Sequence, residues 1–182
     1  MKWMIASDIH GSAKYCRMVF ERFAAEGADR ILLLGDLLYH GPRNDLPDEY
    51  APKEVTKILN ENKDYIVAVR GNCDAEVDQM VLEFPIMADY AVFPMGKSIV
   101  FVTHGHINGE DNPPPLRSGD ILLHGHTHVQ RCVPHDNFVY MNPGSTSLPK
   151  EDSVRGYMLW EDRSFVWKNL ETGETLMTYE AE

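Results

Sequence analysis

Residues 121–128 read Ile121-Leu122-Leu123-His124-Gly125-His126-Thr127-His128 and give the clearest indication of the architecture. The aliphatic residues predict a buried strand, and the glycine allows the backbone to turn where that strand ends. The turn would place His126 and His128 close together. Neutral imidazoles in pairs are ligands for divalent transition metals. A solvated turn is the alternative for three histidines in five residues, so a metal site requires matching ligands elsewhere in the chain.

Length and composition predict a single domain spanning 1–182. The 182 residues are enough for one sizeable core, and hydrophobic and charged contents of 43% and 25% are ordinary for a globular protein. No apolar run approaches the length of a membrane span, and the first residues resemble a strand more than a signal peptide. The three cysteines are widely spaced and indicate no disulfide framework. We therefore expect a cytoplasmic protein without membrane association.

The charge balance restricts the partners of the protein. A formal net charge of −11 argues against nucleic-acid binding, which depends on neutralising phosphates. It does not exclude a small phosphate-bearing substrate. Bound cations can reverse the sign of the local field, and they are often the largest charges in a site.

The first half of the chain alternates strands and helices. Ser12 is expected to cap a helix that runs to about Glu26 and that Gly27 ends. A second helix is expected to reach about Asn62. The predicted strands cover residues 2–7, 30–34 and 65–69. This order predicts right-handed crossovers and a parallel sheet.

The second half of the chain is dominated by short strands separated by turn signals. A short helical piece is expected around 77–82. The strands are predicted at 90–93, 98–103, 121–124, 129–133, 138–142, 157–161, 165–170 and 175–179. Their spacing predicts a second, largely antiparallel sheet that packs on the first. The fold class is therefore α/β.

Metal-binding side chains stand just beyond the ends of five predicted strands. Ligands gather at the carboxyl ends of strands in parallel sheets, so these side chains are expected to converge. The candidate ligands are Asp8, His10, Asp36, Asn72, His104, His126 and His128. Any one of them could be an ordinary turn or cap residue. Their joint placement favours a metal centre.

The donor types indicate which chemistry such a centre would support. Carboxylate, imidazole and amide donors without thiolate favour manganese, iron, zinc or magnesium. Seven ligands are too many for one tetrahedral ion and suit two ions that share a bridging carboxylate, for which Asp36 is the candidate. Two divalent ions outweigh the charges of Asp8 and Asp36, so a phosphate would be attracted. The matching reaction is two-metal hydrolysis, in which a metal-bridging hydroxide attacks phosphorus.

These motifs resemble the signature of calcineurin-like metallophosphoesterases over nearly the first 150 residues. The matching segments are Asp8-Ile9-His10, Gly35-Asp36, Gly71-Asn72-Cys73-Asp74, His104 and Gly125-His126-Thr127-His128. The resemblance implies a two-sheet β-sandwich flanked by helices and the hydrolysis of phosphodiesters. It implies two manganese ions, with Mg2+, Fe2+, Zn2+ or Ni2+ as alternatives.

The resemblance also implies how the ligands divide between the two ions. One ion would be held by Asp8, His10, Asp36 and His128. The other would be held by Asp36, Asn72, His104 and His126.

Cys73 departs from the pattern of the broad family, in which many members have a histidine that assists the leaving group. A thiol is a poor substitute near neutral pH. We therefore expect a preference for diesters with weakly basic leaving groups, and inert packing is the default reading of Cys73. His106 is the first candidate for a substitute acid, which makes Asp36, His10 and His106 the predicted catalytic residues.

Several other residues are assigned to the surroundings of the site. His40 and Arg43 could bind a phosphate oxygen, and solvation of their loop is the alternative. Asp74 is expected to orient a neighbouring ligand, and Ser145 is a further candidate donor. We interpret His124 as a buried histidine and His135 as a surface residue.

Two other functions are compatible with this reading. The first is a non-catalytic interaction scaffold like the retromer subunit that resembles this family but has lost parts of the metal set. Here all seven positions carry donors, which favours an enzyme. The second is a phosphomonoesterase. A homo-oligomer is compatible with the apolar residues of the late strands.

Overall fold

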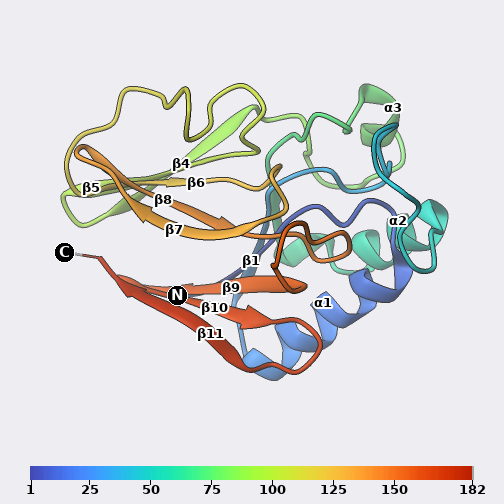
Figure 1. The fold of residues 1–182 in the computed structure, drawn as a ribbon. Helices are drawn as coiled ribbons and strands as arrows, with labels where there is room; N and C mark the ends of the chain where they lie inside the picture. Colours follow the sequence, from blue (N-terminus) through green and yellow to red (C-terminus); the bar gives the residue numbers. More distant parts are fainter. Residues whose placement is uncertain (182) are drawn as a thin grey trace.

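The computed structural model describes residues 1–181 and contains two stacked sheets with helices against one of them (Figure 1). The six-stranded sheet has the order β11 (Thr175–Glu180), β10 (Ser164–Asn169), β9 (Gly156–Glu161), β1 (Lys2–Ala6), β2 (Arg30–Leu33), β3 (Ile66–Ala68). The five-stranded sheet has the order β4 (Tyr90–Met95), β5 (Ser98–Thr103), β6 (Asp120–Leu123), β8 (Phe138–Pro143), β7 (Gln130–Pro134). The predicted two-sheet sandwich is confirmed.

The parallel part of the six-stranded sheet is also confirmed. Strands β1, β2 and β3 pair in parallel, and α1 (Ala13–Glu26) and α2 (Pro52–Glu61) connect them. Ser12 caps α1 by accepting a hydrogen bond from the backbone N–H of Tyr15, and Gly27 ends it in the left-handed conformation with φ 61°. The short helix α3 (Glu76–Gln79) follows β3. No helix in residues 1–181 is long and apolar enough to cross a membrane.

The prediction of a largely antiparallel second sheet was wrong. Strands β9, β10 and β11 extend the first sheet instead, because β9 pairs antiparallel with the edge of β1 that β2 leaves free. The second sheet is mixed, since β5, β6 and β8 pair in parallel. Turn signals and apolar alternation predict that a strand exists, but they do not specify its neighbour.

Alternating side chains of the central strands serve two cores. Met4 and Ala6 of β1 pack toward the helices, where Val19 of α1 and Leu59 of α2 are buried. Ile5 points the other way into the core between the sheets. The central strands are therefore covered on both faces, which explains why their sequences are continuous apolar runs. Their carboxyl ends open at one edge of the sandwich.

Glu26 ties the end of α1 to two strands of the sheet. Its Oε1 accepts hydrogen bonds from the Tyr157 hydroxyl, at 2.7 Å, and from the Lys168 ammonium. Burial disfavours the charged form, but these partners outweigh it, so the pKa of Glu26 lies below its ordinary value. Ionised Glu26 therefore stabilises the folded state.

Glu26→Gln is expected to lower the free energy of unfolding at pH 7 by roughly 1–2 kcal/mol. A depressed folded-state pKa gives stability that is present above the unfolded pKa and is lost as the pH falls through the folded value. The difference between wild type and variant should therefore shrink by about pH 3. Urea titrations at both pH values measure it, with exposed Glu21→Gln as the control. An equal deficit at both pH values would contradict the ionic explanation.

Candidate metal centre

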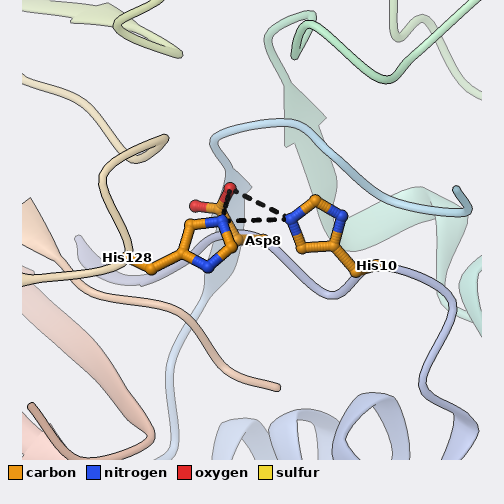
Figure 2. Close-up of side chains that lie close together, drawn as sticks. All are labelled: Asp8, His10 and His128. Atoms are coloured by element: carbon orange, nitrogen blue, oxygen red, sulfur yellow. Dashed lines mark hydrogen bonds and ion pairs between the residues drawn. The ribbon is translucent and has the colours of Figure 1, made fainter. Parts of the chain in front are cut away.

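Asp8, His10 and His128 form the first group of converging donors (Figure 2). Asp8 and His10 follow β1, and His128 lies in the loop after β6. The His128 Nε2 lies 3.2 Å from Asp8 Oδ1 and 3.1 Å from His10 Nε2. The His10 Nε2 lies 3.6 Å from the same carboxylate oxygen. Three donor atoms from distant parts of the sequence therefore face one point.

The other ring nitrogens of this group determine which atoms are free to bind. The Nδ1 of His10 lies 2.8 Å from the carbonyl oxygen of Tyr39, and the Nδ1 of His128 lies 2.6 Å from that of Leu148. A carbonyl only accepts, so each Nδ1 carries the proton and donates it. In the neutral rings both Nε2 atoms then present lone pairs to each other. A cation bound between the two Nε2 atoms would relieve this contact. Metal-binding histidines usually donate from the other ring nitrogen in this way.

Asp36, Asn72, His104 and His126 form the second group. His104 donates from Nδ1 to the carbonyl of Leu34 at 2.7 Å, so its Nε2 faces inward. That Nε2 lies 3.1 Å from Asn72 Oδ1, 3.2 Å from His126 Nδ1 and 3.4 Å from Asp36 Oδ2. In the neutral ring this Nε2 would present a lone pair beside the acceptor atoms, which is a donor set that a cation could bind.

Asp36 lies between the two groups. Its Oδ2 is 3.7 Å from the His10 Nε2 of the first group and 3.4 Å from the His104 Nε2 of the second. Its Oδ1 accepts a hydrogen bond from the backbone N–H of Cys73 at 2.8 Å, which fixes the carboxylate. The carboxylate therefore lies where it could bridge two cations, one in each group.

An orphaned oxygen gives a test of whether a cation fits. Asp8 Oδ1 is buried and has no hydrogen-bond partner within residues 1–181. A buried carboxylate oxygen without a donor is costly, and a bound cation would satisfy it. Its neighbours are the Nε2 atoms of His10 and His128, which are candidate cation ligands as well. The donor set therefore fits a divalent metal.

The backbone is strained at the candidate ligands. Five of them have positive φ angles between 50° and 66°, in the left-handed region that residues other than glycine seldom adopt. They are Asp8, His10, Asp36, His126 and His128. Such strain costs about 1–3 kcal/mol per residue and concentrates at functional sites. The fold thus holds these side chains in a geometry that the isolated segments would not choose.

Buried hydroxyls hold the first strand end in place. Ser7 donates to Asp8 Oδ2 at 2.5 Å. Ser145 and Ser147 donate to the carbonyl oxygen of Asp8 at 2.8 and 3.0 Å. The expected role of Ser145 near the site thus corresponds to a contact with the backbone of a candidate ligand.

Asp74 orients the second group through the backbone. Its Oδ2 accepts hydrogen bonds from the N–H groups of Asp36 and Gly71 at 2.8 and 2.7 Å, and its Oδ1 accepts one from Leu37 at 2.9 Å. It therefore locks the loop after β2 to the loop after β3. These contacts would allow Asp74 to orient a neighbouring ligand, and that role stays a prediction.

The electrostatics favour ionised carboxylates beside the imidazoles. Burial disfavours the charge of Asp8, but contacts with His10 and His128 outweigh it and hold its pKa well below the ordinary value. Burial likewise opposes protonation of His104, but the Asp36 carboxylate raises its pKa to about 9. Burial and the charge of His104 lower the pKa of His126 to about 4. A proton on His104 therefore offsets part of the charge of the two carboxylates at neutral pH.

A recess opens above the two groups. Its walls include the candidate ligands Asp36, Asn72, His126 and His128, together with Cys73. The loop after β2 contributes Gly41, Pro42, Arg43 and Asn44, and the segment after β8 contributes Lys150. Burial and the charge of Asp36 raise the pKa of the Cys73 thiol to about 12.

Lys150 and Asn44 are recess residues that the sequence reading missed. Asn44 directly follows the predicted phosphate-binding residue Arg43, whereas Lys150 belongs to no motif and stands seven residues beyond the end of β8 in the sequence. The one usable signal for Lys150 was Ser145, expected near the site, which stands five residues before it in the sequence.

Two residues proposed for substrate binding or proton transfer, His40 and His106, are not among the residues that line the recess. The His40 ring packs at 4.8 Å from the Tyr39 ring and 5.1 Å from the Tyr50 ring. The His106 ring lies 5.4 Å from that of His104, and burial lowers its pKa. Both rings have a buried Nδ1 without a hydrogen-bond partner in residues 1–181.

The remaining two histidines lie outside the metal centre. His124 is buried and stacks on Tyr140, and its Nε2 accepts a hydrogen bond from the backbone N–H of Glu110 at 3.2 Å. His135 is exposed and lies 3.0 Å from the carboxylate of Glu110. Both positions agree with the sequence interpretation.

Comparison with known proteins identifies the class. Residues 1–164 match the model of the calcineurin-like phosphoesterase superfamily domain, and the chain belongs to this superfamily.

Among individual proteins, phosphodiesterase YfcE of Escherichia coli K12 is 48% identical over 157 residues, which cover 86% of this chain and 85% of YfcE. The solved structure of E. coli YfcE, described as a phosphoesterase, superposes with a TM-score of 0.96 at 42% identity over the whole of both chains. The probable metallophosphoesterase YsnB of Bacillus subtilis is 25% identical over 166 residues, 87% of this chain and 83% of YsnB. Vacuolar protein sorting 29 of Cryptosporidium parvum, with a TM-score of 0.64 at 18% identity over 98% of this chain and 97% of its own, shares the fold alone. This chain is therefore a phosphoesterase-family protein that is most informatively compared with YfcE.

Proposed function

We propose that the protein is a metal-dependent phosphodiesterase that binds two divalent ions, with manganese as the native metal and the cytoplasm as its location. The observation that carries the proposal is the convergence of inward-facing imidazole nitrogens on Asp8 and Asp36. Its similarity to a phosphodiesterase at 48% identity supports the reaction class.

The ligand assignment follows the two groups. Asp8, His10, Asp36 and His128 would hold one ion, and Asp36, Asn72, His104 and His126 would hold the other. Bound divalent ions would supply charge to stabilise the phosphate oxygens and to lower the pKa of a water nucleophile. The protein's own residues fix this charge in place and line the recess that admits the substrate.

The three predicted catalytic residues have different roles in this proposal. Asp36 holds the centre together from the position between the groups. His10 keeps its Nε2 directed inward because Tyr39 holds its Nδ1. His106 is the candidate proton donor beside His104, and because burial lowers its pKa, a smaller fraction of it carries a proton at neutral pH.

The direct test is hydrolysis of bis-p-nitrophenyl phosphate and p-nitrophenyl phosphate by protein stripped with a chelator. Turnover should be absent after stripping, return with manganese, and be faster for the diester. Manganese should also raise the melting temperature, because a ligand that binds only the folded state stabilises it. Faster cleavage of the monoester would assign the protein as a phosphomonoesterase. Thermal stabilisation without turnover of either ester would favour the interaction scaffold.

Cys73 gives a prediction about the leaving group. Its thiol stays protonated at neutral pH and is a poor acid, so departure of the leaving group should proceed with little protonation. Rates for a series of aryl methyl phosphates should therefore fall steeply as the phenol pKa rises, and Cys73→Ala should change kcat by less than about threefold. A flat dependence on the phenol pKa in wild type would show that an efficient proton donor operates.

A further inference from the structure

We propose that Arg43 and Lys150 form a cationic rim that binds a second anionic group of the substrate, specifically a phosphate attached to the diester that is cleaved. This inference rests on the proposed phosphodiesterase function and narrows its substrate class. The substrate would be a diester that carries an additional phosphate, and a diester with neutral substituents would be a poorer one.

Both cations lie on the walls of the recess above the metal centre. Arg43 belongs to the loop after β2, which also carries Asp36, and Lys150 follows the turn that leaves β8. The backbone N–H of Lys150 donates to the carbonyl oxygen of His128 at 3.1 Å, which ties this segment to a candidate ligand. Two separate segments thus bring positive charge to the same opening.

Neither cation has an acidic partner. Within residues 1–181 no ion pair involves Arg43 or Lys150, although acidic residues are close in sequence to both. Three of these acidic residues pair elsewhere: Asp48 with Lys14, Glu49 with Arg17, and Glu151 with Arg131. Asp45 and Asp152, two residues from Arg43 and Lys150 respectively, form an ion pair with neither cation in the described part of the chain. On a chain with a net charge of −11, two cations without partners at one opening are available for an anionic ligand.

A charge count distinguishes this rim from the metal centre. Two divalent ions, offset by Asp8, Asp36 and a hydroxide nucleophile, leave one positive charge, and this matches the single charge of a phosphodiester. The two charges of the rim therefore exceed what a simple diester requires. They match the charge of a further phosphate group, which carries about −1.5 to −2 near neutral pH.

The two side chains suit a phosphate. The guanidinium of Arg43 can bind two phosphate oxygens with its fork of donors, and the ammonium of Lys150 acts as a point charge. Both side chains are exposed at the opening, so the attraction should weaken as salt concentration rises.

The test compares two substrates that share one scissile bond. They are the 5′-(p-nitrophenyl phosphate) ester of thymidine and the same ester with a 3′-phosphate. With manganese present, wild type should cleave the 3′-phosphorylated ester with a kcat/KM about tenfold higher, mainly through KM. The double variant Arg43→Gln/Lys150→Met should bring the ratio to within about twofold of one. Arg43→Lys should retain part of the preference because it keeps the charge.

A matched control separates the rim from a general effect of charge. Lys97→Met removes one cation from the turn between β4 and β5, outside the recess. It should leave the ratio at the wild-type value. A ratio that falls equally in Lys97→Met would overturn the inference, because the preference would then follow net charge.

Calorimetry provides a readout that does not depend on turnover. Thymidine 3′,5′-bisphosphate should bind the manganese-loaded protein about tenfold more tightly than thymidine 5′-monophosphate, and the double variant should lose this difference. If both esters are cleaved at equal efficiency and both nucleotides bind equally, the rim inference fails while the phosphodiesterase function stands. If neither ester nor bis-p-nitrophenyl phosphate is cleaved with manganese, the proposed function fails and the rim inference fails with it.

Discussion

Replacing Asp36 with asparagine is expected to lower the manganese-dependent kcat for bis-p-nitrophenyl phosphate by about 10³-fold, which corresponds to about 4 kcal/mol. The carboxylate lies between the two donor groups, with Oδ2 3.7 Å from the His10 Nε2 and 3.4 Å from the His104 Nε2. An amide has the same shape but carries no charge and cannot bridge two cations. Its oxygen can still accept the hydrogen bond from the Cys73 N–H, so the fold should persist.

Two measurements make this expectation specific. The increase in melting temperature produced by manganese should be smaller in Asp36→Asn than in wild type, because one shared ligand is lost. Asp45→Asn makes the same change of charge at an exposed position of the following loop and should behave like wild type in both assays. Wild-type rates in Asp36→Asn would refute the bridging assignment.

Gly125→Ala is the second substitution with a large expected effect. A Cβ at this position would lie 1.9 Å from Ser7 Oγ and 2.7 Å from Asp8 Oδ2. Ser7 is fully buried, so the end of β6 must separate from the end of β1. Overpacking of this kind costs about 1–3 kcal/mol of stability. Because Asp8 and His126 would move apart, manganese affinity should fall by about 10–100-fold.

A second substitution distinguishes this clash from a general intolerance of the turn. Ser7→Gly removes the side chain that the new methyl group meets most closely. Combined with Gly125→Ala, it should restore part of the free energy of unfolding and part of the manganese affinity. Urea titration and calorimetry measure the two quantities. A double variant as impaired as Gly125→Ala alone would show that the close approach to Ser7 is not the cause.

Much of the site could be predicted because its residues follow strands that are easily recognised in the sequence. The runs before Asp8, Asp36 and Asn72 are apolar and end abruptly, and parallel strands bring such ends to one edge. The structure places these donors together with the histidines of the later loops. The sheet to which β9 belongs was harder to predict. We expected β9 in the second sheet, but it pairs with β1 of the first. Pairing depends on which edge is free in three dimensions, and the local pattern of residues does not contain that information.

By itself the sequence determined which segments form strands and helices and which donor residues follow them, because apolar periodicity and capping residues act over short distances. Only the tertiary structure decided how the donors face one another. The carbonyls of Tyr39, Leu34 and Leu148 hold the outer imidazole nitrogens of three histidines, and this leaves the inner ones free. It also decided that Lys150 and Arg43 line the same recess. Both facts depend on contacts between segments far apart in the chain, which exist only once the two sheets have packed.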